Sequence, residues 1–266
     1  MTGVLDRLFG VEGKQVVVTG GSRGIGAMIA RGFVEAGAHV CISARKADAC
    51  DATAAELDAL EGSGTCTSIP ADLSTQEGVD TLAAAVAERT GGMVHVLVNN
   101  AGATWGEPLD DYPEAAFDKL FNINVKGAFL LTQALLPALR AAASEDDPSR
   151  VINIGSIDGI RTPSMETYAY STTKAGILAL TRHLAKNLVR DHVNVNAIAP
   201  GPFESKMMAF ALGSDEGRQM VASTVPMRRI GRPDDMAGAA LFLAGRGGSY
   251  LCGETIVVDG GIANVG

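Results

Sequence analysis

The sequence predicts an α/β protein with one parallel sheet of seven strands and helices on both faces. Short apolar runs bounded by turns alternate with longer helical patterns along the whole chain, and no linker-like segment interrupts them. Strands buried on both faces have such continuous apolar runs, and their alternation with helices favours right-handed crossovers and a parallel sheet. With 266 residues, 47% of them hydrophobic, the chain is long enough for one large core. We therefore expect a single domain over residues 1–266.

Seven segments carry the strand pattern, and the segments between them carry the helical one. The strands are predicted at residues 14–19, 38–43, 65–70, 94–98, 149–155, 192–198 and 255–259. Two stretches are less regular. Residues 142–150 are charged and are predicted to form a surface loop, and residues 201–226 are rich in Met, Gly and Ser.

The first strand is followed by the glycine-rich run TGGSRGIG at residues 19–26, which opens a helical pattern. Glycines permit a tight turn and a close approach of a ligand to the backbone. A helix that starts there presents free N–H groups and the positive end of its dipole to a phosphate. The spacing of Gly20, Gly24 and Gly26 differs from the general G-x-G-x-x-G fingerprint, so the run alone could also be a purely structural turn.

Tyr170 and Lys174 lie four residues apart in the run YAYSTTKAG. Residues at this spacing share one helix face, so the ammonium of Lys174 is expected close to the phenol of Tyr170. A neighbouring positive charge favours the phenolate and lowers the pKa of a phenol from about 10 toward the range of acid/base catalysis. Tyr168 has Thr172 four residues later and cannot form this pair. The spacing by itself also occurs on solvated helix faces.

Further motifs follow in a fixed order: NNAG at 99–102, NVKG with Asn124, Ser156 after a strand, and PG at 200–201. Together with the glycine run and the Tyr–Lys pair, this order resembles the short-chain dehydrogenase/reductase family over essentially the whole chain. The resemblance implies a doubly wound, Rossmann-type fold and hydride transfer between a nicotinamide cofactor and a carbonyl or alcohol.

The family resemblance assigns four catalytic residues. Tyr170 would donate a proton to the carbonyl oxygen of a ketone, or accept one from an alcohol in reverse. Lys174 would lower the pKa of Tyr170 and hydrogen-bond the cofactor ribose, and Ser156 would stabilise charge on the substrate oxygen. Asn124, preferred over Asn122 because it directly precedes VKG, would hold a helix irregularity and a water that relays protons to Lys174.

The resemblance also implies a cofactor-binding set, in which Ser205 stands where the family more often has Thr. Asp72 would contact the adenine of the cofactor, or it could instead cap the helix starting near Ser74. The complete set is Gly20, Ser22, Arg23, Gly24, Ile25, Gly26, Arg45, Lys46, Asp72, Leu73, Asn100, Ala101, Gly102, Tyr170, Lys174, Pro200, Gly201, Phe203 and Ser205.

The end of the second predicted strand favours NADP(H) over NAD(H). An acidic residue about 20 residues after the glycines would bind the ribose 2′-hydroxyl of NAD. Here Arg45 and Lys46 stand there, and the next carboxylate is Asp48. Arg45 can form charge-assisted bonds to a 2′-phosphate, and Arg23 in the glycine loop could add a second cation. The alternative is that these cations are simply solvated.

Substrate identity is less constrained. Within the family, the runs SARKADACDATA, IPADLS, NNAGATWGEPLDDYP and RVINIGS resemble the NADPH-dependent 3-oxoacyl reductases, in particular those of the rhamnolipid pathway. A 3-oxoacyl thioester is therefore the favoured substrate, and the alternatives are a secondary-alcohol dehydrogenase for a steroid or polyol and a non-catalytic nucleotide sensor. An acyl channel could be lined by Trp105, Ile157, Tyr168 and Met207. Residues 201–226 would form a flap over the substrate. In this segment Phe203, Met207, Met208 and Phe210 could supply an apolar cover for the site, or they could belong to a helix packed on the core.

Composition excludes several other classes of protein. A net charge of −8 argues against a nucleic-acid or anionic-membrane partner. The four cysteines form no CxxC pair, so no metal site or disulfide framework is expected, and Cys41 and Cys66 are expected to be buried. No signal peptide or membrane span is recognised, which makes a cytoplasmic enzyme the expectation. The family resemblance implies a homotetramer or homodimer, formed through helices near residues 127–140 and 172–189.

Overall fold

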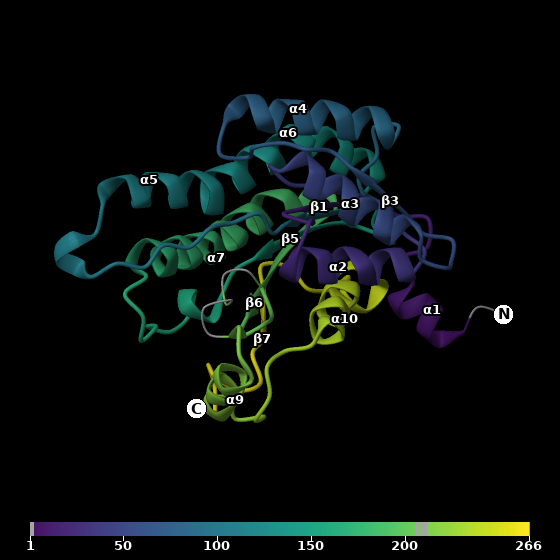
Figure 1. Ribbon diagram of the computed structural model, residues 1–266. Coiled ribbons are helices and arrows are strands. Elements are labelled where there is room, and N and C mark those ends of the chain that lie inside the picture. Colours follow the sequence, from purple (N-terminus) through teal and green to yellow (C-terminus); the bar gives the residue numbers. More distant parts are fainter. Residues whose placement is uncertain (1–2, 206–207, 209–211, 266) are drawn as a thin grey trace.

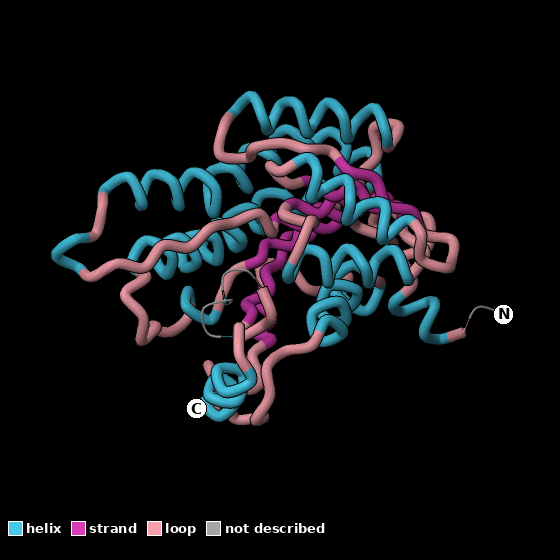
Figure 2. The backbone as a smooth tube through the Cα atoms, in the orientation of Figure 1, coloured by secondary structure: helices cyan, strands magenta, loops and turns pink. Residues whose placement is uncertain are grey.

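The computed structural model describes residues 3–205, 208 and 212–265. Its centre is one parallel seven-stranded sheet in the order β3-β2-β1-β4-β5-β6-β7, flanked by helices (Figures 1 and 2). The strands are β1 Gln15–Thr19, β2 His39–Ser43, β3 Thr65–Ser68, β4 Val96–Asn99, β5 Ser149–Ile154, β6 Val193–Pro200 and β7 Thr255–Val258. The predicted fold class is confirmed, and the predicted strand ends differ from the observed ones by two residues or fewer.

Apart from α1, which precedes the first strand, the α-helices lie in the connections between strands, on both faces of the sheet (Figure 1). The α-helices are α1 Val4–Phe9, α2 Gly24–Glu35, α3 Ala47–Asp58, α4 Gln76–Arg89, α5 Glu114–Phe121, α6 Gly127–Ala142, α7 Tyr168–Leu188, α9 Asp215–Thr224 and α10 Pro233–Ala244. Short helical turns are η1 Leu109–Asp111, η2 Asn122–Lys126, η3 Ile157–Gly159, η4 Val189–Asp191 and η6 Arg246–Gly248. Within the described ranges, no helix combines the length and the apolar character that crossing a membrane requires.

Alternate residues of the strands belong to two separate hydrophobic cores, one on each face of the sheet. In β1, Val16 and Val18 join a cluster with α2, α3 and α10, whereas Val17 joins a second cluster with α4, α6 and α7. Successive strand side chains point to opposite faces, so a strand that is apolar at every position is buried between two helical layers. Cys66 and Cys41, both free thiols, are buried in these two cores, one in each.

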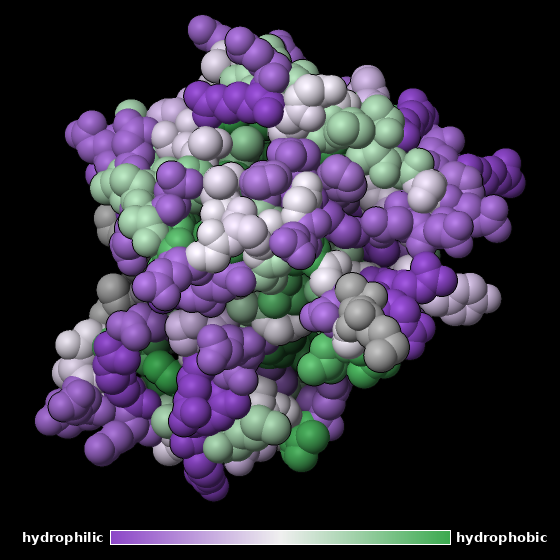
Figure 3. All heavy atoms as spheres, turned by 90° about the vertical axis from the view of Figure 1, so that its right-hand side faces the viewer, coloured by the Kyte–Doolittle hydropathy of each residue, from purple (hydrophilic) through white to green (hydrophobic). Residues whose placement is uncertain are grey.

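The helices present polar residues outward. On the face seen in Figure 3, hydrophilic side chains predominate, and hydrophobic ones show in smaller patches between them. Such a division is expected for helices that turn one apolar stripe toward the sheet.

One part of the predicted surface loop at 142–150 is corrected by the structure. Residues 143–148 do form a loop, but Ser149 and Arg150 belong to β5 and are 0% and 1% exposed. Arg150 can be buried because main-chain oxygens and a carboxylate surround it. Its Nε and Nη2 donate to the carbonyl oxygens of Leu243 and Gly245 at 3.1 and 3.3 Å.

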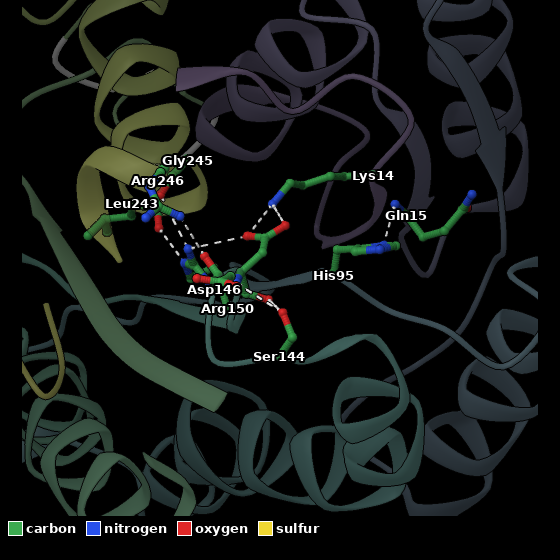
Figure 4. Close-up of polar contacts among 10 residues, drawn as sticks. Lys14, Gln15, His95, Ser144, Asp146, Arg150, Leu243, Gly245 and Arg246 are labelled. Atoms are coloured by element: carbon green, nitrogen blue, oxygen red, sulfur yellow. Dashed lines mark hydrogen bonds and ion pairs between the residues drawn. The ribbon is translucent and has the colours of Figure 1, made fainter. Parts of the chain in front are cut away.

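An ion cluster completes this polar network at the amino ends of β1 and β5 (Figure 4). Asp147 lies between two cations: its Oδ2 is 2.7 Å from Lys14 Nζ, and its Oδ1 is 3.6 Å from Arg150 Nη2. Nearby, Arg246 donates to the carbonyl oxygen of Asp146 at 2.9 Å. The network ties the start of two central strands to the end of α10.

Candidate active site

The predicted site residues lie at the opposite edge of the sheet, where the strands end. Thr19 ends β1, Asn99 ends β4 and Pro200 ends β6. The strand order reverses between β1 and β4, since the chain passes outward to β2 and β3 and then returns to the other side of β1. In open α/β sheets, ligands bind in the crevice at such a reversal, outside the carboxyl ends of the strands.

The glycine loop is packed so tightly that side chains would not fit. Gly20 has a φ of 64°, and a Cβ there would lie 2.7 Å from Asn100 Nδ2. A Cβ on Gly26 would overlap the carbonyl oxygen of Gly20 and the same amide. The Asn100 amide in turn donates to the carbonyl oxygen of Thr19 at 2.8 Å. The loop therefore needs glycine for its packing against the end of β4 as well as for its backbone shape.

Thr19 organises this junction, although sequence reasoning gave it no role. Its Oγ1 accepts the backbone N–H groups of Asn100 and Ala101 at 2.9 and 3.0 Å, and donates to the carbonyl oxygen of Val98 at 3.2 Å. The signal was present in the sequence as a hydroxyl residue directly between an apolar strand and the glycines. Its side chain holds the ends of β1 and β4 together.

Helix α2 starts inside the loop and points its amino end at the crevice. The side chain of its N-cap residue, Arg23, makes no capping hydrogen bond to the first N–H groups of the helix. Ser22 and Ile25 flank this end, and a Cβ on Gly24 would lie 3.2 Å from Cβ of Ser205. The segment after β6 therefore comes up against the glycine loop, and an anion between them would meet the helix dipole.

The three predicted cations, Arg23, Arg45 and Lys46, are all exposed beside this loop. Arg45 Nη1 lies 4.0 Å from Asp72 Oδ2, with side chains 61% and 43% exposed. Burial acts to raise the pKa of Asp72, but hydrogen bonds from Ser74 and the charge of Arg45 lower it overall. The cations thus sit at the end of β2, where a 2′-phosphate would need them.

Asp72 is not the cap of helix α4, which was one interpretation of the sequence. Thr75 is the N-cap, because its Oγ1 accepts the N–H of Gly78 at 3.1 Å. Asp72 Oδ1 instead accepts the N–H and the hydroxyl of Ser74 at 3.0 and 2.7 Å. The side chain of Leu73 is buried in the α4–α6 core, so only its backbone could meet a cofactor.

Asn124 lies in a π-helical turn, η2, between α5 and α6, which is the helix irregularity predicted for it. Its side chain is buried and forms two hydrogen bonds with the backbone of Ala103. Asn124 Oδ1 accepts the Ala103 N–H at 2.9 Å, and Asn124 Nδ2 donates to the Ala103 carbonyl oxygen at 3.0 Å. Nδ2 also donates to Thr173 Oγ1 at 2.9 Å. Asn124 therefore fixes the segment after Gly102 against α7, and Thr173, which sequence reasoning missed, is its partner there.

Ser156, Tyr170 and Lys174 come together from two elements. Ser156 follows β5 and caps the turn η3, where its Oγ accepts the N–H of Asp158 at 3.1 Å. Tyr170 and Lys174 lie on successive turns of α7, with Lys174 Nζ 5.7 Å from the Tyr170 ring centroid. Lys174 is 5% exposed, and its Nζ donates to the carbonyl oxygen of Ile154 at 2.7 Å.

The structure does not show the lowered pKa that the Tyr–Lys spacing predicts for Tyr170. Burial raises the pKa of the phenol to about 12, a hydrogen bond with Ser156 acts to lower it, and the charge of Asp158 acts to raise it. Burial also lowers the pKa of Lys174 to about 8. The spacing indicated the right neighbours but could not show that both groups are desolvated, and desolvation disfavours each charged form. Tyr170 is consequently a neutral phenol at neutral pH.

The segment after β6 begins beside β7, and one of the residues expected in its apolar cover is buried in the core. Gly201 donates to the carbonyl oxygen of Val258 at 2.9 Å, which extends the pairing of β6 with β7 beyond Pro200. Phe203 is 2% exposed, with its ring against Gly231, so it belongs to the core and does not cover the site. Met207 and Phe210 lie outside the described residues.

Of the residues expected along an acyl channel, Trp105 and Tyr168 are linked through Tyr112, and Ile157 belongs to a separate small cluster. Trp105, 37% exposed, contributes its carbonyl oxygen as acceptor for the hydroxyl of Tyr112 at 3.3 Å. Tyr112 also packs edge-on against Tyr168 with centroids 5.4 Å apart. Ile157 packs elsewhere, in a small cluster with Val225 and Ile262 near the C-terminus. Tyr112, which joins Trp105 to Tyr168, was not among the predicted residues.

Known proteins resemble this chain over nearly its whole length. Residues 20–263 match the family described as "Enoyl-(Acyl carrier protein) reductase". The rhamnolipids biosynthesis 3-oxoacyl-[acyl-carrier-protein] reductase of Pseudomonas aeruginosa is 47% identical over 95% of this chain and 97% of its own. A sorbitol dehydrogenase of Cereibacter sphaeroides is 35% identical over 94% and 98%.

A solved structure gives the same picture at the level of the fold. The Pseudomonas aeruginosa RhlG/NADP active-site complex superposes with a TM-score of 0.92 at 46% identity, covering 97% of this chain and 99% of that one. The sheet order, the glycine loop under Asn100, and the Ser–Tyr–Lys group beside a π-helical Asn are thus found in a chain whose relatives are reductases and dehydrogenases. The chain belongs to the short-chain dehydrogenase/reductase family.

Proposed function

We propose that the protein is an NADPH-dependent ketone reductase in which Tyr170 is the general acid. The observation that carries this proposal is the pairing of Tyr170 with Lys174 on α7, next to Ser156 at the carboxyl edge of the sheet, in a site where burial raises the pKa of the phenol. Reduction of a ketone needs a proton donor at the carbonyl oxygen, and a phenol with a pKa of about 12 holds its proton at neutral pH.

The residues of the crevice fit a dinucleotide phosphate. At Gly20 and Gly26, where a Cβ would collide with neighbouring atoms, the absence of a side chain leaves the backbone accessible to a ligand. The N–H groups at the start of α2, which the Arg23 side chain does not cap, would bind the pyrophosphate. Arg45, Lys46 and Arg23 would hold a 2′-phosphate, which Asp72 alone would repel. The rest of the proposed set lies at or just after the ends of β4 and β6 and would line the crevice: Asn100, Ala101, Gly102, Pro200, Gly201 and Ser205. The bound cofactor supplies the hydride.

The protein side chains would handle the proton and the developing charge. Ser156 Oγ already accepts the Asp158 N–H, so its own hydroxyl proton can be donated to the substrate oxygen. Tyr170 transfers its proton to that oxygen, which becomes the alcohol. Lys174 would bind the cofactor ribose. Asn124 holds the backbone at Ala103 against α7 through its hydrogen bonds to Ala103 and Thr173. The Asn124 water relay to Lys174 is part of the same proposal.

A 3-oxoacyl thioester is the substrate class we propose. It is supported by the 47% identical relative, whose name specifies a 3-oxoacyl reductase, and by the aromatic cluster of Trp105, Tyr112 and Tyr168 beside the start of α7. The 35% identical sorbitol dehydrogenase favours a second candidate, oxidation of a polyol. A sensor without catalysis would not need Ser156, Tyr170 and Lys174 together.

We also propose one domain over residues 1–266, with residues 201–226 acting as the substrate flap, and a homotetramer or homodimer. Large apolar side chains that are exposed on α5, α6 and the turn after α7 support self-association through these helices: Phe117, Phe121, Phe129 and Val189. Sedimentation at micromolar concentration tests it, and a monomer would contradict it.

The proposed function is tested by NADPH oxidation with N-acetylcysteamine thioesters of short, medium and long 3-oxo acids. A matched panel of polyols with NADP⁺ tests the second candidate. We expect turnover with the thioesters, with higher kcat/KM for NADPH than for NADH. Faster oxidation of a polyol than reduction of every thioester would replace the proposal by the second candidate, and nucleotide binding without turnover would leave only a sensor.

A further inference from the structure

The cations proposed for the 2′-phosphate come from two neighbouring segments of the chain. Arg23 belongs to the glycine loop after β1, whereas Arg45 and Lys46 follow β2, and all three side chains are exposed. The segments meet just before these cations, where the N–H of Gly21 donates to the carbonyl oxygen of Ser43 at 3.2 Å. Cations that converge on one phosphate repel one another before it binds. Such a site should therefore bind more tightly where the backbones of its two segments are held together in advance.

A threonine on α3, Thr53, joins these two segments. The helix starts directly after Lys46, and the Thr53 side chain is partly buried. Its Oγ1 is 3.0 Å from the carbonyl oxygen of Ser22 in the glycine loop and 2.9 Å from that of Ala49 in its own helix. The hydroxyl has one proton, which these two acceptors share. One of the two bonds therefore leaves the helix and ties α3 to the loop.

The carbonyl group of Ser22 belongs to the peptide that leads into Arg23. Because the peptide bond is planar, a hydrogen bond to the Ser22 oxygen restrains the plane from which Arg23 continues. Arg23 itself is extended, with φ −174° and ψ 170°, and stands just before the first turn of α2. Gly20, proposed for the pyrophosphate, is held by a different contact, since its carbonyl oxygen accepts from Asn100 Nδ2 at 3.2 Å. The Thr53 bond thus acts on the part of the loop that carries the cation.

We propose that Thr53 is a positioning residue for the 2′-phosphate of NADPH: its hydroxyl ties α3 to the glycine loop and so holds the backbone of Arg23 next to the segment that carries Arg45 and Lys46. The inference rests on the proposed function, because it deepens the NADPH preference assigned to that site. NADH lacks the 2′-phosphate, so the tie should contribute little to its binding.

Removing the hydroxyl should separate the two cofactors. Thr53→Val keeps the branched shape and a similar helix propensity, and it deletes both hydrogen bonds of the side chain. KM for NADPH should rise about fivefold, the size expected for one neutral hydrogen bond, while kcat at saturating NADPH and KM for NADH stay as in the wild type. Thr53→Ser retains a hydroxyl and should restore KM for NADPH. An equal rise of KM for both cofactors would overturn the inference, because it would show that the whole loop had loosened.

Thr90→Val is the matched control for the bond inside the helix. The Thr90 hydroxyl donates to the carbonyl oxygen of Val86 at 2.9 Å, four residues earlier, as the Thr53 hydroxyl does to Ala49. Thr90 stands at the end of α4 and is not bonded to the glycine loop through this hydroxyl. Thr90→Val should leave KM for both cofactors unaltered. If it raised KM for NADPH as much as Thr53→Val, the effect would belong to helix stability and the inference would fail.

A second readout does not depend on turnover. Adenosine 2′,5′-bisphosphate carries the 2′-phosphate without the nicotinamide, and 5′-AMP lacks that phosphate, so isothermal titration with both isolates the 2′-phosphate site. The Kd for the bisphosphate should rise about fivefold in Thr53→Val and return in Thr53→Ser, and the Kd for 5′-AMP should not change. Unchanged bisphosphate binding by folded Thr53→Val overturns the inference, as does a wild type that binds both nucleotides equally. Weakened binding that Thr53→Ser rescues, in a protein that reduces no ketone, supports the inference and refutes the proposed function.

Discussion

The two ends of the parallel sheet both carry polar groups, but they use them differently. At the amino ends, Lys14 and Arg150 share Asp147, and Arg150 also donates to two carbonyl oxygens at the end of α10. At the carboxyl ends, the N-cap side chain of α2, Arg23, makes no capping hydrogen bond, and the cations Arg45 and Lys46 are exposed. The first end satisfies most of its charges within the chain, whereas the second presents groups that can bind a ligand.

The difference teaches how one fold separates stability from chemistry. A buried guanidinium persists where main-chain oxygens and a carboxylate surround it. Tyr170 and Lys174 are also desolvated, yet each is held in the neutral or easily neutralised form, with the pKa of Tyr170 raised and that of Lys174 lowered. Groups whose proton equilibria are displaced in this way cluster at functional sites. Substitutions at the two ends should therefore affect different measurements.

Tyr170→Phe should have the largest effect. It keeps the ring and removes only the proton, so kcat for ketone reduction should fall about a thousandfold, the range for loss of a general acid. Thermal unfolding and the Kd for NADPH should change little. The matched control is Tyr168→Phe, which removes a hydroxyl bound to Glu166 outside the catalytic group. Equal kcat values for wild type and Tyr170→Phe would remove Tyr170 from the mechanism.

Arg150→Met tests the opposite end of the sheet. It removes the side-chain donor to the carbonyl oxygens of Leu243 and Gly245, of which Gly245 still accepts the N–H of Gly248 at 3.3 Å, and should lower the free energy of unfolding by about 3 kcal/mol, measured by urea denaturation. Arg246→Met, which removes an exposed donor to Asp146, is the control and should cost far less. Below the melting temperature, KM for NADPH should stay as in the wild type. A changed KM without loss of stability would show that the two ends are not separate.

Gly26→Ala should disrupt the glycine loop that we propose binds the cofactor phosphates. The added methyl group would overlap the carbonyl oxygen of Gly20 and the Asn100 amide, so the loop must shift. We expect a loss of NADPH affinity of more than about tenfold by isothermal titration. Gly238→Ala, on α10 with no atom near the new Cβ, is the control and should stabilise the protein slightly. Unimpaired NADPH binding by Gly26→Ala would exclude this loop as the phosphate site.

Arg45→Ser sharpens the cofactor assignment. The Arg45 side chain is 61% exposed, and its ion pair with the Asp72 carboxylate is long, at 4.0 Å, so its loss should have little effect on folding. We expect kcat/KM with NADPH to fall about fivefold, with NADH unaffected. Arg31→Ser, which removes an exposed arginine paired with Glu35 on α2, is the charge-matched control. Retained preference for NADPH in Arg45→Ser would place the 2′-phosphate elsewhere.

The smallest effect should come from His95 at the amino end. Its Nδ1 accepts the N–H of Gln15 at 3.0 Å, and burial, with Lys14 nearby, lowers its pKa below 6.5. The unfolded chain therefore binds more protons than the folded one as the pH falls through 6.5. The stability that His95 contributes is present above this pH and is lost below it. Urea unfolding at neutral and mildly acid pH should show this loss, and His95→Gln should flatten it. An equal slope in both proteins would contradict the assignment.

The sequence was sufficient for the fold and for the neighbours in the site. Apolar strand runs such as residues 149–155 were recognisable because both faces of a parallel strand are buried. The motifs around Asn124, Ser156 and Tyr170 marked side chains that the structure does bring to one edge.

What the sequence could not provide depends on contacts between distant segments. The burial of Arg150 depends on carbonyl oxygens at the end of α10, and the raised pKa of Tyr170 depends on its burial in the folded chain. The burial of Phe203 likewise depends on a distant segment, because Phe203 forms an isolated parallel β-bridge with Gly231. Thr19 and Thr173 were missed because a hydroxyl residue has many possible local partners, and only the fold selects one.

The central claim is best tested by following the two hydrogens of the reduction. The wild type and Tyr170→Phe are each incubated with a 3-oxoacyl N-acetylcysteamine thioester and NADPH in which both hydrogens at C4 of the nicotinamide are replaced by deuterium, and the product is analysed by mass spectrometry. We predict deuterium on the new carbinol carbon with the wild type, and almost no alcohol with Tyr170→Phe. Deuterium-free alcohol, or labelled alcohol formed equally fast by Tyr170→Phe, would contradict the account.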